Sequence, residues 1–284
     1  VQAKGLLINR VSPKLPFPVR FFQFQVAFEG ARPYHFRMDL LLPAGTAMNL
    51  PVIISGDGCW RYENELVQQR ILNRGYGLAI FSRSELIPDI FHTHEQRTGW
   101  LYDVFPGMRF GAISAWAWGF HRCIDVLQTL PEIDASRIVI TGHSRGGKAA
   151  LLAGATDERI AVTNANDSGC CGAGCHHIHG QGCEKIARIT QNFPFWFTPE
   201  LAEYAGRDHE LPIDQHMLKA AVAPRALLTT EAMDDLWANP YGTMQTHLAA
   251  RPVFKLLGAE DQQAIYYRPG YHAHLLEDFQ TLLD

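Results

Sequence analysis

The 284-residue chain has no run of Lys and Arg, no long apolar stretch, no internal repeat and no low-complexity linker. Its net charge is -4, and only 19% of its residues are charged. Phosphate binding needs clustered basic side chains, so we expect no nucleic-acid partner. A membrane-crossing helix needs roughly 18 or more apolar residues, so we expect no membrane partner. The sequence therefore favours one globular domain over residues 1–284.

Cysteine is also scarce, because there are only six residues and four of them lie between Cys170 and Cys183. A chain of this length does not need disulfides for stability. The Cys170–Cys183 segment also contains His176, His177 and His179, and Cys and His are zinc ligands. Its spacing does not form two C-x-x-C pairs, so we expect no bound metal and no cofactor.

Short apolar segments recur along the chain, with helical patterns between the later ones. The first two alternate in polarity, which is typical of half-exposed antiparallel strands, and the later ones are continuous, which is typical of buried parallel strands. The predicted strands are 22–28, 36–42, 52–55, 78–81, 138–141, 160–164, 226–229 and 265–267, and the predicted helices are 113–130, 148–155 and 275–283. This order predicts an α/β fold in three layers, with a central, mostly parallel sheet flanked by helices.

The segment from Ser168 to Pro224 is longer than one crossover helix requires and is rich in Gly, His and aromatic residues. Long ordered segments inside compact domains are often functional. We therefore expect an insertion or lid-like region at about 168–224.

A serine motif follows the predicted strand 138–141. The sequence Gly142-His143-Ser144-Arg145-Gly146 matches G-x-S-x-G, and a helix pattern begins directly after it. In the α/β-hydrolase fold this strand–turn–helix context exposes a nucleophilic serine on a tight turn, which needs glycines on either side. The motif predicts Ser144 as the nucleophile of a serine esterase, with the helix N-terminus aimed at the oxyanion.

A nucleophilic serine needs a histidine base and an acid that orients it. The histidine is expected in the loop after the last strand, where His272 and His274 are both candidates. The acid is either Asp167 or one of the pair Asp234 and Asp235, since both loops are predicted at the carboxyl end of the sheet. The sequence leaves both choices open.

The motif extends to Gly142-His143-Ser144-Arg145-Gly146-Gly147-Lys148, which resembles the G-C-S-R-x-G-K signature of the glucuronoyl esterases, carbohydrate esterase family 15. Further similar segments follow in the family's order from Pro51 onwards. They are Asp167 to Cys175, Phe195-Trp196-Phe197, Leu211 to His216, Ala223-Pro224-Arg225, Asp235 to Pro240 and the closing Gly-x-His-x-His. The Cys- and His-rich segment coincides with the family's Gly-rich loop, which weakens a metal interpretation further.

The resemblance implies a 4-O-methyl-glucuronoyl methylesterase that cleaves glucuronic acid esters between xylan and lignin alcohols. Ser144 would attack the carboxyl carbon, and Arg145 would stabilise the oxyanion. The substrate ring would contact Lys148, Glu184 and Trp237. Asp167 would be the acid, and the family pattern favours His274 over His272 as the base. A disulfide at Cys175 is also implied.

Two departures from the family pattern keep alternatives open. His143 and Leu275 stand where the family often has a disulfide pair, and Asp167 replaces a Glu. A carbohydrate acetyl esterase and a non-catalytic carbohydrate-binding relative are therefore the competing functions. The resemblance further implies a glucuronate ester or glucuronoxylan substrate, a monomer, and a secreted or periplasmic location.

Overall fold

The computed structural model describes the chain except for residues 12, 46–47 and 91–96. Its nine strands are β1 (Lys4–Asn9), β2 (Val19–Glu29), β3 (Pro33–Pro43), β4 (Leu50–Ser55), β5 (Gly77–Phe81), β6 (Ile133–His143), β7 (Ile160–Asn166), β8 (Ala226–Ala232) and β9 (Gln263–Arg268). They form one sheet in the order β1-β2-β3-β5-β4-β6-β7-β8-β9. Every predicted strand is confirmed, and β1 was not predicted.

The α-helices are α1 (Glu65–Asn73), α2 (Trp100–Val104), α3 (Ala112–Leu127), α4 (Arg145–Thr156), α5 (Ile186–Asn192), α6 (Gln215–Ala220), α7 (Pro240–Leu256) and α8 (Leu276–Leu283). Short 3-10 helices are η1 (Arg83–Glu85), η3 (Pro194–Trp196), η4 (Pro199–Tyr204), η5 (Asp208–Glu210), η6 (Leu236–Ala238) and η7 (Glu260–Gln262). The predicted helices are confirmed as α3, α4 and α8. No helix among the described residues has the length and hydropathy that a membrane span requires.

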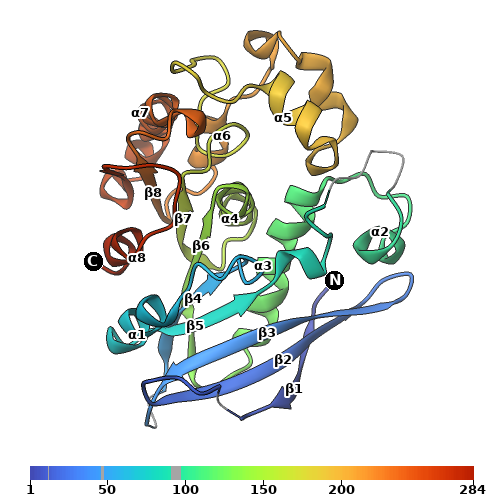
Figure 1. Ribbon diagram of the computed structural model, residues 1–284, viewed down its shortest axis with the longest axis vertical. Helices are drawn as coiled ribbons and strands as arrows, with labels where there is room; N and C mark the ends of the chain where they lie inside the picture. The colour runs from blue at the N-terminus through green and yellow to red at the C-terminus, as the bar shows by residue number, and fades with distance from the viewer. Residues whose placement is uncertain (12, 46–47, 91–96) are drawn as a thin grey trace.

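The first three strands pair antiparallel, and all neighbours from β5 to β9 pair parallel. Helices cover both faces of this sheet (Figure 1). One face packs α1 and α8 around Ile71 and Phe279, and the other packs α3 and α4 around Trp116 and Phe120. The predicted three-layer α/β fold is therefore confirmed.

Strands β6, β7 and β8 lie side by side and end at the same edge, so their following loops meet there. The segment 168–224 leaves β7 at that edge and contains α5, α6 and three 3-10 helices (Figure 1). It returns through a cis peptide between Ala223 and Pro224 to begin β8. The segment thus lies over the edge where the candidate site residues gather.

Candidate active site

Ser144 occupies the tight turn between β6 and α4. Strand β6 ends at His143 and α4 begins at Arg145, so Ser144 alone makes the reversal. Its φ is 55° and its ψ is -118°, a backbone conformation that costs a non-glycine residue of order 1–3 kcal/mol. The Ser144 amide donates to the Asn166 carbonyl at 2.8 Å, which ties the turn to the end of β7. We call residues 142–147 the Ser144 turn.

The glycines of the Ser144 turn are required by close contacts. A Cβ on Gly142 would lie 2.4 Å from the Gly146 carbonyl oxygen, and a Cβ on Gly146 would lie 2.2 Å from Asp57 Oδ1. Such distances are shorter than any side chain tolerates, and the first involves backbone that cannot move aside. The close packing of Gly142 against Gly146, and of Gly146 against Asp57, therefore keeps the Ser144 turn in its strained conformation.

Asp57 packs against the Ser144 turn, although no sequence motif indicated a role for it. Its buried carboxylate accepts a hydrogen bond from the His143 amide at 2.8 Å and forms an ion pair with Arg83. Burial raises the pKa of Asp57, and the Arg83 guanidinium opposes that rise. Asp57 thus anchors the backbone immediately before Ser144.

His272 and Asp235 form a hydrogen-bonded pair at the same edge of the sheet. The His272 Nδ1 lies 2.5 Å from Asp235 Oδ2, and the Asp235 side chain is buried. His272 is 41% exposed and lines the same cavity as Ser144. A partly exposed imidazole held through Nδ1 leaves Nε2 for a partner in the cavity. This is the arrangement that a base–acid pair beside a serine requires.

His274 has different surroundings from His272, although only one residue separates them. Its ring is buried and stacks on Phe279 with centroids 4.1 Å apart. Neither ring nitrogen has a hydrogen-bond partner among the described residues. Burial keeps the pKa of His274 well below its usual value, so the ring is neutral. His274 therefore packs the core, and it does not line the cavity with Ser144.

Asp167 lies close to the His272–Asp235 pair but has its own partners. Its Oδ1 accepts from the Ala232 amide at 2.6 Å, and its Oδ2 accepts from the buried Arg268 guanidinium at 3.0 Å. One ligand atom each of Asp167, Asp235 and His272 lie within 4.8 Å of one another. Burial raises the pKa of Asp167 to about 7. The fold thus brings two of the candidate acids to one histidine.

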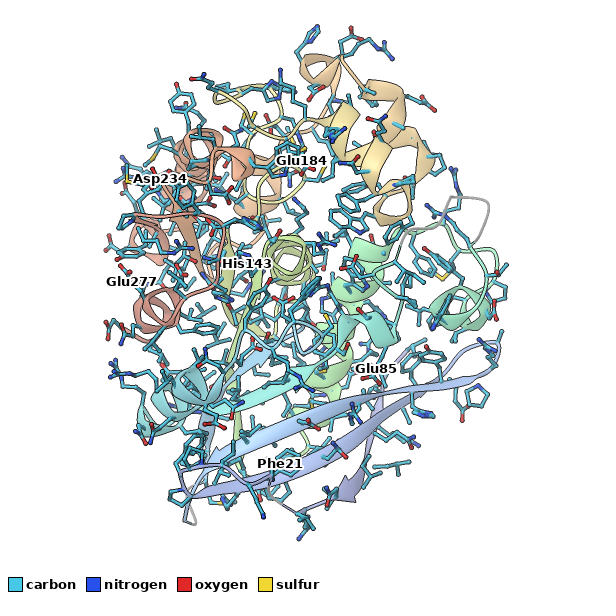
Figure 2. The ribbon with its side chains drawn as sticks, viewed as in Figure 1. Phe21, Glu85, His143, Glu184, Asp234 and Glu277 are labelled. Carbon is cyan, nitrogen blue, oxygen red and sulfur yellow. The ribbon has the colours of Figure 1, made fainter. Side chains whose placement is uncertain are left out.

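Asp234 does not line the cavity that Ser144 and His272 share. It is exposed at the periphery of the molecule (Figure 2). Its Oδ2 accepts from the Gly270 amide at 3.0 Å. Its own amide donates to the Gly270 carbonyl at 3.1 Å. Asp234 therefore holds the loop that carries His272 and does not contact the imidazole.

A cavity of about 240 Å³ opens beside Ser144 and His272. The predicted Arg145, Lys148, Glu184 and Trp237 line it. Asp167 lines it as well. Sequence reasoning had not assigned the remaining lining residues to the site, and of these only Asn192 and Phe193 lie outside the segments that resemble the family. The remaining lining residues are Ser168, Gly169, Asn192, Phe193, Trp196 and Ala238.

Lys148 and Glu184 form a buried polar pair in this cavity. The Lys148 ammonium donates to the carbonyls of Ser168 and Cys170 at 2.6 and 2.5 Å, and it lies 4.0 Å from the Glu184 carboxylate. Burial raises the pKa of Glu184, and Lys148 opposes the rise. Trp237 is 46% exposed at the rim, and its carbonyl accepts from the Glu184 amide at 3.0 Å. These groups suit a polyhydroxylated ring, which offers donors, acceptors and an apolar face.

The Arg145 guanidinium is fixed by an acid and by aromatic rings. It lies 3.1 Å from Asp89 Oδ1 and 4.7 Å from the centroid of the Trp196 ring, with Phe193 and Trp60 also within cation–π range. Its backbone N–H opens α4, where unpaired amides favour negative charge. Asp89 carried no motif in the sequence.

The disulfide expected at Cys175 is wrong. All six cysteines lie in the described part of the chain, and all are free thiols. Cys175 Sγ instead donates to Asp214 Oδ2 at 3.0 Å. The partner of Cys175 is thus the Asp214 carboxylate and not a second cysteine. The same carboxylate also accepts from the His176 amide at 2.8 Å.

Solved structures of similar architecture include carbohydrate esterases. A promiscuous CE15 esterase from a marine bacterial metagenome superposes with a TM-score of 0.83 and 26% identity, covering 100% of this chain and 85% of that one. A CE15 glucuronoyl esterase from Caldicellulosiruptor kristjansonii superposes with a TM-score of 0.82 and 30% identity, covering 98% and 77%. The fold is thus the α/β-hydrolase fold of that group.

Curated relatives agree with the structures. Carbohydrate esterase MZ0003, from an unknown prokaryotic organism, is 35% identical over 80% of this chain and 55% of its own length. The 4-O-methyl-glucuronoyl methylesterase 1 of Phanerochaete chrysosporium is 33% identical over 84% of this chain and 50% of its own length. The chain thus spans about half the length of the curated relatives it matches.

A family model confirms the resemblance that the serine motif indicated. The model described as "Glucuronyl esterase, fungi" matches residues 26–258, which include the Ser144 turn, Asp167, Glu184 and Asp235. His272 lies beyond that match, but the marine metagenome esterase structure covers the whole chain and so includes it. The chain belongs to the glucuronyl esterase family.

Proposed function

We propose that this protein is a serine esterase that hydrolyses esters of glucuronic acid, with 4-O-methyl-glucuronate esters of glucuronoxylan as its substrate class. The observation that carries the proposal is the shared cavity. It brings the strained Ser144 and the Asp235-paired His272 together with the Lys148–Glu184 pair. The name of the P. chrysosporium relative supports the same substrate class.

The proposed reaction begins at Ser144. His272 Nε2 takes the hydroxyl proton while Ser144 Oγ attacks the ester carbonyl, and Asp235 stabilises the imidazolium through Nδ1. The oxyanion forms beside the Arg145 amide at the N-terminus of α4, with the Arg145 guanidinium nearby. His272 returns the proton to the leaving alcohol, and an acyl-enzyme remains.

Water completes the proposed cycle. His272 deprotonates a water molecule that attacks the acyl carbon, and the returned proton restores Ser144 as the uronic acid departs. Lys148 and Glu184 would hold ring hydroxyls, and Trp237 would cover a face of the sugar. We assign the base to His272 rather than to His274, because His274 is buried against Phe279 and faces no cavity with Ser144. We assign the acid to Asp235, with Asp167 as the neighbouring carboxyl.

The proposal extends to the protein as a whole. We infer one α/β-hydrolase domain whose insertion, residues 168–224, supplies Glu184 and Trp196 to the cavity. We further infer a secreted or periplasmic location, because the proposed substrate is a polymer of the plant cell wall, and we propose that the protein is a monomer.

The test is hydrolysis of the benzyl ester of glucuronic acid by wild type, Ser144→Ala, His272→Ala and His274→Ala, with acetylated xylan assayed in parallel. We expect Ser144→Ala and His272→Ala to lower kcat by several orders of magnitude. His274→Ala should lower the melting temperature but retain most of kcat, since it removes packing only. Cleavage of acetyl esters alone would overturn the substrate, and retention of activity by Ser144→Ala would overturn the mechanism.

A further inference from the structure

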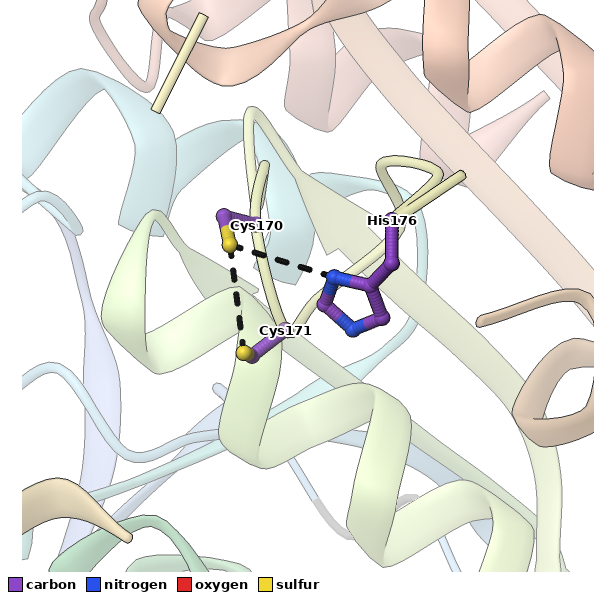
Figure 3. A group of neighbouring side chains, drawn as sticks. All are labelled: Cys170, Cys171 and His176. Carbon is purple, nitrogen blue, oxygen red and sulfur yellow. Dashed lines mark hydrogen bonds between the residues drawn. The ribbon is translucent and has the colours of Figure 1, made fainter. Parts of the chain in front are cut away.

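Three side chains of the types that bind metals converge within the insertion, outside the set of residues used in the proposed reaction. Cys170 Sγ lies 3.9 Å from Cys171 Sγ and 4.0 Å from His176 Nδ1 (Figure 3). All three ligand atoms lie within 4.8 Å of one another. Atoms this close together can bind one cation, since zinc lies about 2.3 Å from sulfur ligands and about 2.1 Å from nitrogen ligands.

The backbone brings the two adjacent sulfurs to one side. Neighbouring side chains in extended chain point in opposite directions, but Cys171 has a φ of 57°, in the left-handed region. Strain of this kind persists only where the surroundings impose it. Here the Gly172 and Gly174 amides both donate to the Gly169 carbonyl, at 2.9 and 3.0 Å. The pairing of the two thiols is therefore built into the loop.

The backbone of His176 is held in place from a different element. Asp214 precedes α6, and its Oδ1 accepts from the amides of His176 and Gln215 at 2.8 and 2.7 Å. The Gln215 side chain donates to the Gly172 carbonyl at 2.6 Å, which joins the same support to the cysteine loop. These hydrogen bonds fix the backbone positions from which the His176 imidazole and the two cysteine side chains project.

The three side chains form an open site. Cys170 and His176 are buried, Cys171 is partly buried, and Cys171 and His176 line a cavity of about 520 Å³. The cavity leaves room for water as a fourth ligand. Cysteine sulfur and imidazole select zinc-like cations over magnesium or calcium. The spacing of Cys and His in the sequence predicted no metal. That spacing does not reveal this site, because the fold of the loop brings Cys170, Cys171 and His176 together.

We propose that Cys170, Cys171 and His176 bind one thiophilic divalent cation, Zn²⁺ or Cd²⁺, with water from the cavity in the fourth position. Both thiols lose their protons to solvent as they bind, so each cation bound releases two protons from the cysteines. The neighbouring Lys148 donates to the Cys170 carbonyl, so the cation would also stiffen one wall of the cavity beside Ser144. This proposal is independent of the proposed esterase activity.

The test is a Cd²⁺ titration of the full chain, freed of metal by a chelator and kept reduced with a phosphine. We expect one sulfur-to-cadmium charge-transfer absorption per protein, which Zn²⁺ displaces, and a higher melting temperature with Zn²⁺. Cys171→Ser and His176→Ala should each weaken Cd²⁺ binding more than about 100-fold, since each removes a ligand. Cys59→Ser removes an exposed thiol elsewhere and should bind as wild type does.

The variants are designed so that misfolding cannot be mistaken for ligand loss. Cys171 is partly exposed and His176 lies in a loop, and near-ultraviolet circular dichroism of each variant checks its packing. A wild-type protein without the charge-transfer band overturns the proposal. So does Cys171→Ser that keeps both its fold and wild-type cadmium binding.

Discussion

At the scale of single residues, the site contains two carboxylates near one imidazole. Asp235 reaches His272 Nδ1 directly, whereas both oxygens of Asp167 are occupied by Ala232 and Arg268. A carboxylate that orients the histidine contributes about 10⁴-fold to kcat in serine hydrolases, because it fixes the tautomer and stabilises the imidazolium. A carboxylate that only supports the loop affects kcat indirectly, because it keeps the loop in position.

We therefore expect Asp235→Asn to lower kcat on benzyl glucuronate by about 10³ to 10⁴-fold. Asp167→Asn should lower kcat by no more than about tenfold. The side-chain oxygen of asparagine can still accept from the Ala232 amide, and the ion pair with Arg268 is lost. Steady-state kinetics of the two variants and wild type measure the difference. Equal losses would mean that both acids share His272.

The same two residues mark a limit of sequence reasoning. The motif around Ser144 predicts its strand, turn and helix, because glycine spacing and strand pattern are local signals. Which acid meets which histidine depends on how loops separated by many residues pack, and no local pattern encodes that distance. Family resemblance favoured Asp167 and His274, whereas the described geometry pairs Asp235 with His272. Asp57 and Asp89 carried no pattern, since each acts through tertiary contacts with residues distant in the sequence or in other elements.

At the scale of elements, a buried polar ladder joins the ends of β6, β7 and β8. Thr141 Oγ1 donates to Asn164 Oδ1 at 2.7 Å, and Asn166 Nδ2 donates to Thr230 Oγ1 at 2.9 Å. Asn166 Oδ1 also contacts His143 Nδ1, next to Ser144. Buried polar networks are stabilising when each member is satisfied. The ladder therefore fixes the relative positions of the strand ends from which the loops of Ser144, Asp167 and Asp235 begin.

We expect Asn166→Ala to cost about 1–3 kcal/mol of unfolding free energy, because it leaves buried partners unpaired. It should also lower kcat at least about tenfold, since a small displacement of the Ser144 turn impairs attack. Thr141→Val is the matched control, because it removes a ladder bond farther from the turn and should lower stability without a comparable loss of kcat. Denaturant unfolding and steady-state kinetics separate the two effects.

The strands show which elements the sequence can predict. Strands in the parallel part of the sheet read as continuous apolar runs, and all were predicted. Strand β1 lies at the sheet edge with most of its residues exposed, so neither alternation nor an apolar run marks it. The short helices between Ser168 and Pro224 were also not resolved from the sequence, because their positions follow from packing over the cavity.

At the scale of the whole molecule, buried carboxyls make stability depend on pH. Burial raises the pKa of Glu63 from 4.5 to about 7. Between these values the folded protein binds more protons than the unfolded chain, so stability falls as pH rises through that window. At about 1.4 kcal/mol for each pH unit, this change in the pKa of Glu63 corresponds to no more than about 3.4 kcal/mol. Asp125 acts in the opposite direction, because its arginine partners outweigh burial and lower its pKa, so its contribution is lost in acid.

Glu63→Gln should therefore flatten the decline in stability between pH 4.5 and 7 and raise the unfolding free energy above pH 7. Glu65→Gln makes the same charge change two residues away at an exposed position and should leave the pH dependence nearly unchanged. Urea unfolding of the three proteins at pH 5, 6, 7 and 8 measures it. Parallel curves for wild type and Glu63→Gln would contradict the expectation.

Arg268 gives the C-terminal helix a part in the order of the active site. Its fully buried guanidinium pairs with Asp167 and with Asp278 of α8, and it donates to the carbonyls of Tyr271 and Ala273 on either side of His272. If α8 frays, these bonds lose their common anchor together. We therefore expect helix α8, the His272 loop and the end of β7 to open as one cooperative unit, whose amides show a common free energy of opening in hydrogen exchange.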